Sequence, residues 1–223
     1  MIDIVYEDGE ALVIDKPAGL SIDRPRKGGP SLEDHLDSLR LGFKRRPLAV
    51  HRLDTDTSGC LLLARNPKAH KRFTQAFQDR LVGKTYLGVL DGLPGASEGT
   101  INLPLGKVSS REEGWRMVHD PGGKPSITHW RVLDAREGRA LIEFRPETGR
   151  THQIRIHALE GLGHALAGDP VYGSGHAIGA GRTMLHASAL RVEREGKPPI
   201  EARAPVPRDF GLLGFGETGD GRA

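Results

Sequence analysis

Short runs of apolar and β-branched residues recur along the chain and predict the strands of a sheet. Residues 11–15 form one such run, which Asp8-Gly9 precedes and Lys16-Pro17 follows as turn signals. Further strands are predicted at 84–90, 127–133 and 140–145. Because strands dominate and no regular alternation of strand and helix is present, the pattern favours an α+β fold with a mixed, mostly antiparallel central sheet and a few flanking helices.

Two segments show helical periodicity instead. Ser31 and Asp34 resemble a capping box, and leucines at helical spacing then predict a short helix near 32–40. Asn66-Pro67 is typical of a helix start, and the helix of about 67–80 places Ala69, Phe73, Ala76 and Phe77 on one apolar stripe. The cations of that helix, Lys68, Lys71 and Arg72, fall largely on its other faces.

The remaining segments are less regular. Residues 92–125 are rich in Gly and Pro, which predicts hairpins and an extended loop rather than a second core. Residues 151–159 fit either a strand, by the alternation of Ile154 and Ile156, or a helix capped by Thr148 or Thr151. The glycine-rich stretch 173–182 and the tail 211–223 are expected to be flexible.

At 223 residues the chain can bury one substantial core, so we expect one catalytic domain over residues 1–210. Apolar residues make up 37% and charged residues 27%, and nothing approaches the roughly 18 apolar residues that a membrane span needs. The N-terminus has no signal-peptide pattern, and the single cysteine, Cys60, lies in an apolar run as a small buried hydrophobe. These features lead us to expect a cytoplasmic protein.

The net charge is only +3, yet its distribution along the chain is uneven. From Arg40 to Lys84 there are eleven cations and three acids, whereas acids outnumber cations in the rest of the chain. Such a run is often only a solvated face. It would also attract phosphates without reading a base sequence, which favours RNA as a partner.

Within this basic segment, residues 51–59 place Asp54 and Asp56 in a Thr/Ser/Gly-rich turn before an apolar strand. Carboxylates in such turns often do no more than accept backbone N–H groups, so both could be simple turn formers. A short acid close to Arg52, just before a buried strand, could equally be a reactive carboxylate.

The wider pattern decides between these readings by resemblance. Residues 51–64, HRLDTDTSGCLLLA, are similar to the signature of the RluA family of RNA pseudouridine synthases, in which the Asp of His-Arg-Leu-Asp is catalytic. Four further blocks follow the family's pattern in register between about residues 11 and 190. They are the Lys-Pro turn at 16–19, Lys84-Thr85-Tyr86, the Thr-Gly-Arg-Thr-His-Gln-Ile-Arg block at 148–155, and Gly168-Asp169-Pro170-Val171-Tyr172-Gly173, which Leu185-His186-Ala187 follows. The resemblance implies the pseudouridine synthase fold.

The resemblance also implies roles for particular residues. It makes Asp54 the catalytic carboxylate, which attacks covalently or abstracts a ribose proton, and Arg155 the cation that keeps it ionised. Tyr86 becomes the ring that stacks on the target base, and Arg52 the residue that fills the gap left by the everted uridine. The other residues expected to border the substrate are His51, Thr57, Arg150 and His152, with the two histidines acting as hydrogen-bonded scaffold.

Isomerisation of uridine needs neither redox chemistry nor energy input, so no cofactor is implied. His51, His152 and His157 could suggest a metal site, but no short metal-binding motif such as His-Glu-x-x-His occurs, and we expect no metal. Lys16-Pro17 and Gly168-Asp169 are interpreted as structural turns near the site. The chain starts at the catalytic region, so we expect substrate choice to come from this region alone.

The leading hypothesis is therefore an isomerase that modifies one uridine in a tRNA or rRNA stem-loop and works as a monomer. One alternative is an RNA-binding protein that keeps the shape and has lost the chemistry. Another is a hydrolase, glycosidic or metal-assisted, that uses Asp54 and Asp56 as a carboxylate pair. The resemblance leaves open which RNA, which uridine and which chemical route are used.

Overall fold

The computed structural model describes residues 2–25, 28–110, 114–175 and 180–216. The chain divides into two compact units. Unit 1 comprises Met1–Lys84 and Ala187–Pro205, and unit 2 comprises Thr85–His186 and Val206–Ala223. The strands β5 (Val82–Leu90) and β11 (Leu185–Val192) each have residues in both units.

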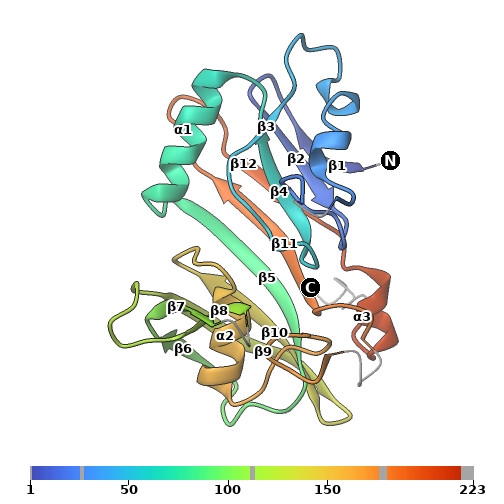
Figure 1. Cartoon of the computed structure of the whole chain (residues 1–223). Helices are drawn as coiled ribbons and strands as arrows, with labels where there is room; N and C mark the ends of the chain where they lie inside the picture. The colour runs from blue at the N-terminus through green and yellow to red at the C-terminus, as the bar shows by residue number, and fades with distance from the viewer. Residues whose placement is uncertain (1, 26–27, 111–113, 176–179, 217–223) are drawn as a thin grey trace. The chain divides into compact units, whose positions relative to one another are not determined.

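Unit 1 is built on an antiparallel sheet in which β2 pairs with both β1 and β4, and β12 pairs with β11 (Figure 1). The bounds of these strands are β1 (Asp3–Glu7), β2 (Ala11–Lys16), β4 (Ser58–Ala64) and β12 (Ile200–Arg203), and the two-residue β3 (Leu48–Ala49) pairs with β4. Every residue of β4 is buried, as expected for a strand that is covered on both faces. The strand predicted at 11–15 is confirmed.

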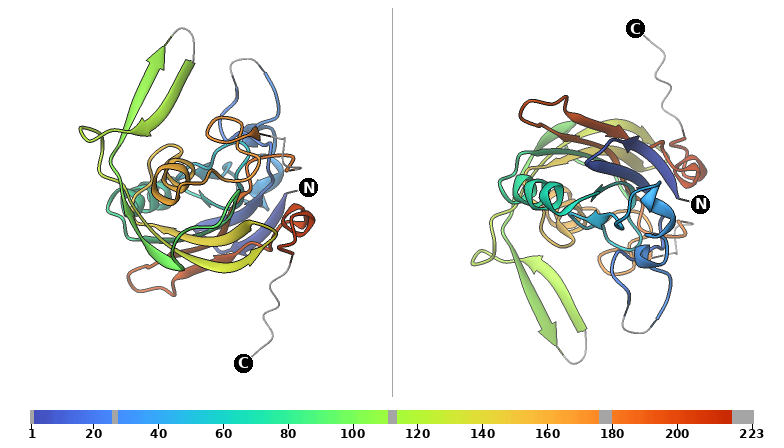
Figure 2. Two further views of the ribbon diagram at one scale, coloured as in Figure 1. Left: turned by 90° about the horizontal axis from the view of Figure 1, so that it is seen from below. Right: turned by 90° about the horizontal axis from the view of Figure 1, so that it is seen from above.

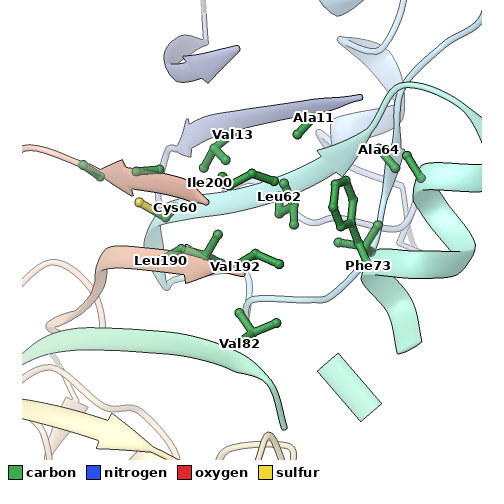
Figure 3. Close-up of a cluster of buried hydrophobic side chains, with 14 residues drawn as sticks. Ala11, Val13, Cys60, Leu62, Ala64, Phe73, Val82, Leu190, Val192 and Ile200 are labelled. Atoms are coloured by element: carbon green, nitrogen blue, oxygen red, sulfur yellow. The ribbon is translucent and has the colours of Figure 1, made fainter. Parts of the chain in front are cut away.

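The helix α1 (Pro67–Gln78) covers this sheet with its apolar stripe. The side chain of Asn66 caps its N-terminus by accepting the N–H of Ala69 at 2.9 Å, so the predicted start is confirmed. Phe73 is 1% exposed and packs into the core with Leu62 and Val82 (Figure 3). The cations of the helix, Lys68, Lys71 and Arg72, are exposed, as the pattern predicted.

The prediction of one short helix near 32–40 is wrong. The structure has two separate 3-10 turns there, Leu32–Asp34 and Ser38–Arg40. The capping box itself is present, since Ser31 N–H donates to the Asp34 carboxylate at 3.0 Å. Only Leu32 and Leu39 are buried, so the short segment lacks the continuous apolar face that would support a regular helix.

Unit 2 has its own antiparallel strands, in the order β5-β10-β9-β6. They are the Thr85–Leu90 part of β5, β6 (Glu98–Asn102), β9 (Ile127–Arg136) and β10 (Arg139–Pro146). A short α-helix, α2 (Gln153–Ile156), packs against these strands and continues as a π-helical turn over His157–Gly161. Ile154, Ala158, Phe144 and Trp130 share one core cluster. The predicted α+β class with a mostly antiparallel sheet is confirmed.

Residues 92–125 form the expected hairpin and one additional strand. The strands β7 (Leu105–Ser110) and β8 (Gly114–His119) pair only with each other among the described residues, whereas β6 joins the sheet beside β9. In both views of Figure 2 the β7–β8 hairpin stands out from β9 and β10 of the same unit.

The C-terminal part of unit 2 contains the short helix α3 (Arg208–Leu212). Part of the tail that was expected to be flexible, residues 211–216, is described, and Phe215 within it is buried against Phe210 and Met184. The rest of that tail, and residues 176–179 of the glycine-rich stretch, lie outside the described residues. The single domain expected over 1–210 stays a prediction. No described helix has the length and apolar character that crossing a membrane requires.

Candidate active site

Asp54 lies in the turn that leads from β3 into β4. The backbone carbonyl of Asp54 accepts the N–H of Thr57 at 3.1 Å, which closes the turn. Asp54 and Asp56 are half-buried, and Thr57 is almost fully buried. The local sequence therefore forms the turn that its Asp, Thr and Ser residues predicted, and it leaves both carboxylates partly accessible to solvent.

The fully buried ammonium group of Lys16 holds this turn in place through hydrogen bonds. Lys16 ends β2 with 0% exposure, and its Nζ donates to the carbonyls of Pro17 at 2.9 Å, Leu20 at 2.8 Å and Thr55 at 3.0 Å. The N–H of Gly19 donates to the same Thr55 carbonyl at 2.9 Å. Because a buried cation is tolerated only when its donors are satisfied, these bonds fix the Lys-Pro turn against the turn that carries Asp54.

Gly59 allows β4 to start directly after the turn. Its φ of +106° is one that L side chains rarely adopt, and a Cβ atom built there would lie 2.3 Å from the carbonyl oxygen of Ala187. The glycine thus permits the close approach of β4 to the Ala187 backbone. Cys60 follows it and is buried, which confirms the prediction of a small buried hydrophobe. Burial raises the pKa of its thiol to about 12.

His51 is part of the scaffold of the same unit. Its Nε2 accepts the N–H of Leu62 at 2.9 Å, and its ring stacks on Phe77 with centroids 4.4 Å apart. Burial, and then the charge of Lys84, lower the pKa of His51 to about 3, so the imidazole is neutral at neutral pH. Burial, with the charge of Arg80, likewise lowers the pKa of Lys84 to about 8. The neighbouring Arg52 is exposed.

In unit 2, Gln153 attaches α2 to β9. Its side-chain oxygen accepts the hydroxyl of Thr148 at 2.8 Å and the N–H of Arg150 at 3.0 Å. Its amide nitrogen donates to the carbonyl of Ile127 and to Oγ1 of Thr128, both at 3.0 Å. Of the two alternatives for residues 151–159, the structure has the helix, which begins at Gln153.

The predicted cap of this helix is wrong. Neither Thr148 nor Thr151 is the N-cap; that position is His152, which has a left-handed backbone with φ of +54°. The hydroxyl of Thr148 is used by Gln153 and by the N–H of Ile127 at 3.1 Å instead. His152 Nδ1 lies 2.9 Å from the hydroxyl of Tyr172 and so links α2 to the 169–172 turn, as expected of a scaffold residue; its contact with the substrate stays a prediction.

Arg155 is buried in α2 and is paired with a carboxylate of its own unit. Its Nε and Nη2 donate to the two oxygens of Asp169 at 2.6 and 2.7 Å. Burial would raise the pKa of Asp169, but the hydrogen bonds and charge of Arg155 and the N–H groups of Tyr172 and Val171 outweigh it and lower that pKa. The ring of Tyr172 lies against the guanidinium, with a centroid distance of 5.0 Å.

Tyr86 and Arg150 lie elsewhere in unit 2. Tyr86 is half-buried on β5, opposite Phe144 of β10, and packs against the core of the unit. The Nε atom of Arg150 donates to the carbonyl of Pro125 at 3.4 Å. Among the described residues, no three His, Cys, Asp or Glu side chains are grouped so that they could hold a metal ion.

Comparison with known proteins identifies the family of this chain. Residues 10–160 match the family model described as RNA pseudouridylate synthase. The chain belongs to the RNA pseudouridylate synthase family. An uncharacterized RNA pseudouridine synthase of Zymomonas mobilis is 54% identical over 95% of this chain and 97% of its own length. Ribosomal large subunit pseudouridine synthase D of the same organism is 35% identical over 95% of this chain and 71% of its own length.

A solved structure supports the fold assignment. The chain resembles human RNA pseudouridylate synthase domain containing 1 with a TM-score of 0.79 and 32% identity, over 95% of this chain and 86% of that one. The predicted family and the predicted enzyme class, an isomerase that acts on RNA, are thereby confirmed.

Sequence reasoning missed two residues that hold Arg155 and His152 of the candidate site in place. Asp169 was interpreted as part of a structural turn and is the buried counter-ion of Arg155. Tyr172 was noted only as a member of the same block, and its hydroxyl contacts both His152 and the backbone of Met117. An acid and a tyrosine three residues apart after a glycine were the available signal. Their partners are distant in sequence, so the pattern could not identify them.

Proposed function

We propose that this family member converts a uridine in an unpaired loop of tRNA or rRNA into pseudouridine, with Asp54 as the catalytic carboxylate. In this reaction the bond between ribose C1′ and N1 of uracil breaks, the base turns while it is held, and C1′ bonds to C5. The proton on C5 is then removed, and N1 carries a proton in the product. The atoms of substrate and product are the same.

The observation that carries the proposal is the position of Asp54 in a turn that buried groups hold in place. Thr57 closes the turn, and Lys16 and Gly19 fix the carbonyl of Thr55 within it. A carboxylate on a turn that is fixed in this way can be presented to a ribose with little loss of entropy. Asp54 would act as a nucleophile or as a general base, and both routes fit this placement.

Other residues are proposed in the roles that the family resemblance gives them. Tyr86 would stack on the uracil, and Arg155 would favour the ionised form of the catalytic carboxylate. Arg52, an exposed cation next to Asp54, would contact the RNA opposite the everted nucleotide. The remaining substrate contacts are assigned to Thr57, Arg150, His51 and His152, the last two through the scaffold that they form.

The substrate class rests on two further observations. The exposed cations of α1 and of the 40–46 segment would attract the phosphate backbone. The similarity to a ribosomal large subunit pseudouridine synthase makes rRNA of the large subunit the first RNA to test, with bulk tRNA as the second. We further propose that the enzyme works as a monomer in the cytoplasm, without a cofactor.

The decisive experiment uses the two acids of the turn as a matched pair. The wild-type protein, Asp54→Asn and Asp56→Asn are incubated with bulk tRNA and with rRNA, and pseudouridine is mapped by carbodiimide modification. Loss of a catalytic carboxylate is expected to slow product formation by roughly 10²–10⁴-fold, whereas Asp56→Asn retains activity. The proposal is wrong if the wild type modifies no RNA or if Asp54→Asn keeps full activity.

The same reactions separate the alternatives. A hydrolase would release free uracil. A protein that only binds RNA would form no product, whether as the wild type or as either variant. A double-mutant cycle, in which the rates of Asp54→Asn, Arg155→Lys and the double variant are compared, tests whether the two residues act together. If Asp54 and Arg155 act in one step, the double variant is expected to be scarcely slower than Asp54→Asn alone.

A further inference from the structure

The β7–β8 hairpin is a two-stranded ribbon that exposes most of its side chains. In β7, residues 107–109 are exposed, and in β8 residues 114–116 are exposed as well. Val108 and Trp115 are 43% and 49% exposed, although both are large and apolar. An isolated two-stranded ribbon is marginally stable by itself, so the position of this hairpin depends on its contacts with the rest of the unit.

Tyr172 provides the contact at the edge of the ribbon. Its hydroxyl donates to the carbonyl of Met117 at 3.2 Å and accepts the N–H of the same residue at 3.2 Å. It also lies 2.9 Å from Nδ1 of His152, and its ring contacts the Arg155 guanidinium. One phenol group therefore joins β8 to the helix that carries Arg155. At the base of the ribbon, Leu105 exchanges two backbone hydrogen bonds with Lys124.

Trp115 extends this connection towards the tip. Its indole stacks on the imidazole of His152, with centroids 5.4 Å apart and an angle of 26° between the rings. Nζ of Lys107 lies 5.3 Å from the centre of the same indole. Trp115 and Lys107 project on the same face of the ribbon, since Trp115 is opposite Ser109 and Lys107 is opposite Met117. The indole thus lies against His152 and remains half accessible.

From this geometry we infer that the β7–β8 hairpin is an RNA-contacting arm in which Trp115 stacks on an unpaired base. The inference rests on the proposed function, because it concerns a second contact with the same RNA. A rigid aromatic ring beside an ammonium group suits a nucleotide, whose base stacks on the ring while its phosphate meets Lys107. The Tyr172 hydroxyl is the positioning group that keeps this arm on α2.

The test measures binding without requiring product. Tryptophan emission of the wild type is compared with that of Trp115→Phe, and the difference, which reports Trp115, is followed during titration with poly(U) and with poly(A)·poly(U) duplex. At equal phosphate concentration, poly(U) is expected to quench the Trp115 signal and the duplex to leave it largely unchanged. Trp115→Ala is expected to weaken poly(U) binding by roughly 5- to 150-fold, the range of base stacking on aromatic side chains.

Val108→Ala is the matched control, because it removes an exposed apolar side chain from the opposite face of the same ribbon. Its affinity for poly(U) should equal that of the wild type. Equal quenching by single strand and duplex, or unchanged affinity of Trp115→Ala, would overturn the assignment of Trp115. Since pseudouridine is not measured, an enzyme inactive on every RNA tested would contradict the proposed function and leave this result standing.

Tyr172→Phe tests the positioning role. It removes the hydroxyl and keeps the ring beside Arg155, so hydrogen exchange at the Met117 amide should accelerate while that at Leu105, at the base, should not. The KM for RNA is expected to rise with little change in kcat, because the arm contributes to binding rather than to the reacting atoms. A Met117 amide as protected as in the wild type would refute the role of the hydroxyl.

Discussion

Arg155 and Asp169 form a buried, bidentate ion pair with N–O distances of 2.6 and 2.7 Å. Their side chains are 8% and 0% exposed. Asp169 Oδ1 also accepts the backbone N–H groups of Val171 and Tyr172, at 2.9 and 3.0 Å. The carboxylate therefore orients the arginine of α2 and at the same time fixes the turn that supplies Tyr172.

Replacing Asp169 by Asn should be strongly destabilising. The amide keeps the size of the side chain and an oxygen for the two N–H groups, but it leaves the buried guanidinium without its counter-charge. Breaking a buried pair from one side costs about 3–5 kcal/mol. We expect the free energy of unfolding in urea to fall by that amount.

A surface pair of the same chemistry is the control for this variant. Arg191 and Glu193 lie 2.6 Å apart, with side chains 53% and 65% exposed. Glu193→Gln should change the free energy of unfolding by less than about 1 kcal/mol, because exposed pairs contribute little. If Asp169→Asn and Glu193→Gln lowered the free energy of unfolding by similar amounts, the buried pair would contribute no more to stability than the exposed one.

The protein should lose stability when the pH falls from about 6.5 towards 3, in part because of His51. Its pKa is lowered from 6.5 to about 3 in the folded state, so only the unfolded chain binds this proton in that interval. The contribution of His51 is complete above pH 6.5 and is lost as the pH falls. One such group gives a slope of at most about 1.4 kcal/mol per pH unit.

The measurement is urea unfolding at pH 8, 6 and 5 for the wild type and for His51→Gln. The variant loses the stacking on Phe77 and is less stable throughout, yet its stability should depend less steeply on pH between 6 and 5. Parallel curves for the two proteins would mean that His51 takes up its proton as readily in the folded state as in the unfolded chain.

Local sequence patterns predicted the elements whose signals are short-range. The helix from Pro67 was predicted because its cap, its proline and its apolar stripe all lie within one segment. The strand at 11–15 was predicted for a similar reason. The segment 32–40 shows the limit of this approach: its capping box is real, but too few apolar contacts follow to sustain a helix.

The candidate site was predictable as a list of residues and not as a network. Family resemblance singled out Asp54, Tyr86 and Arg155 on motifs alone. The roles of Lys16 and Asp169 depend on carbonyls and side chains that lie up to 39 residues away in sequence, and no local pattern encodes such partners. The left-handed His152 was also hidden, since a histidine at a helix N-cap is not the residue type that capping preferences favour.

Lys16→Met should damage the turn that carries Asp54. The substitution keeps the apolar stem but leaves the carbonyls of Pro17, Leu20 and Thr55 without their ammonium donor. The Thr55 carbonyl keeps the N–H of Gly19 as a donor, so the carbonyls of Pro17 and Leu20 are affected most. Each buried acceptor left unsatisfied costs about 1–3 kcal/mol, so we expect the free energy of unfolding to fall by at least about 2 kcal/mol. Pseudouridine formation by the remaining folded protein should fall as well, because the turn would relax.

Lys68→Met is the matched variant, since Lys68 is exposed on the first turn of α1. It should leave the free energy of unfolding within about 0.5 kcal/mol of the wild type. If Lys16→Met were as stable and as active as Lys68→Met, the buried ammonium would have no part in holding the turn.

Gly59→Ala and Gly138→Ala separate backbone strain from steric collision. Both glycines have positive φ, +106° and +76°, but only at Gly59 would a Cβ meet other atoms, at 2.3 Å from the Ala187 carbonyl oxygen. At Gly138 nothing lies within 4 Å, so Ala there should cost only the roughly 1–2 kcal/mol of a left-handed backbone. At position 59 the β4 backbone must move, and we expect a protein that is largely insoluble or melts far below Gly138→Ala. Equal melting temperatures for the two variants would show that β4 can shift without disturbing the turn at Asp54.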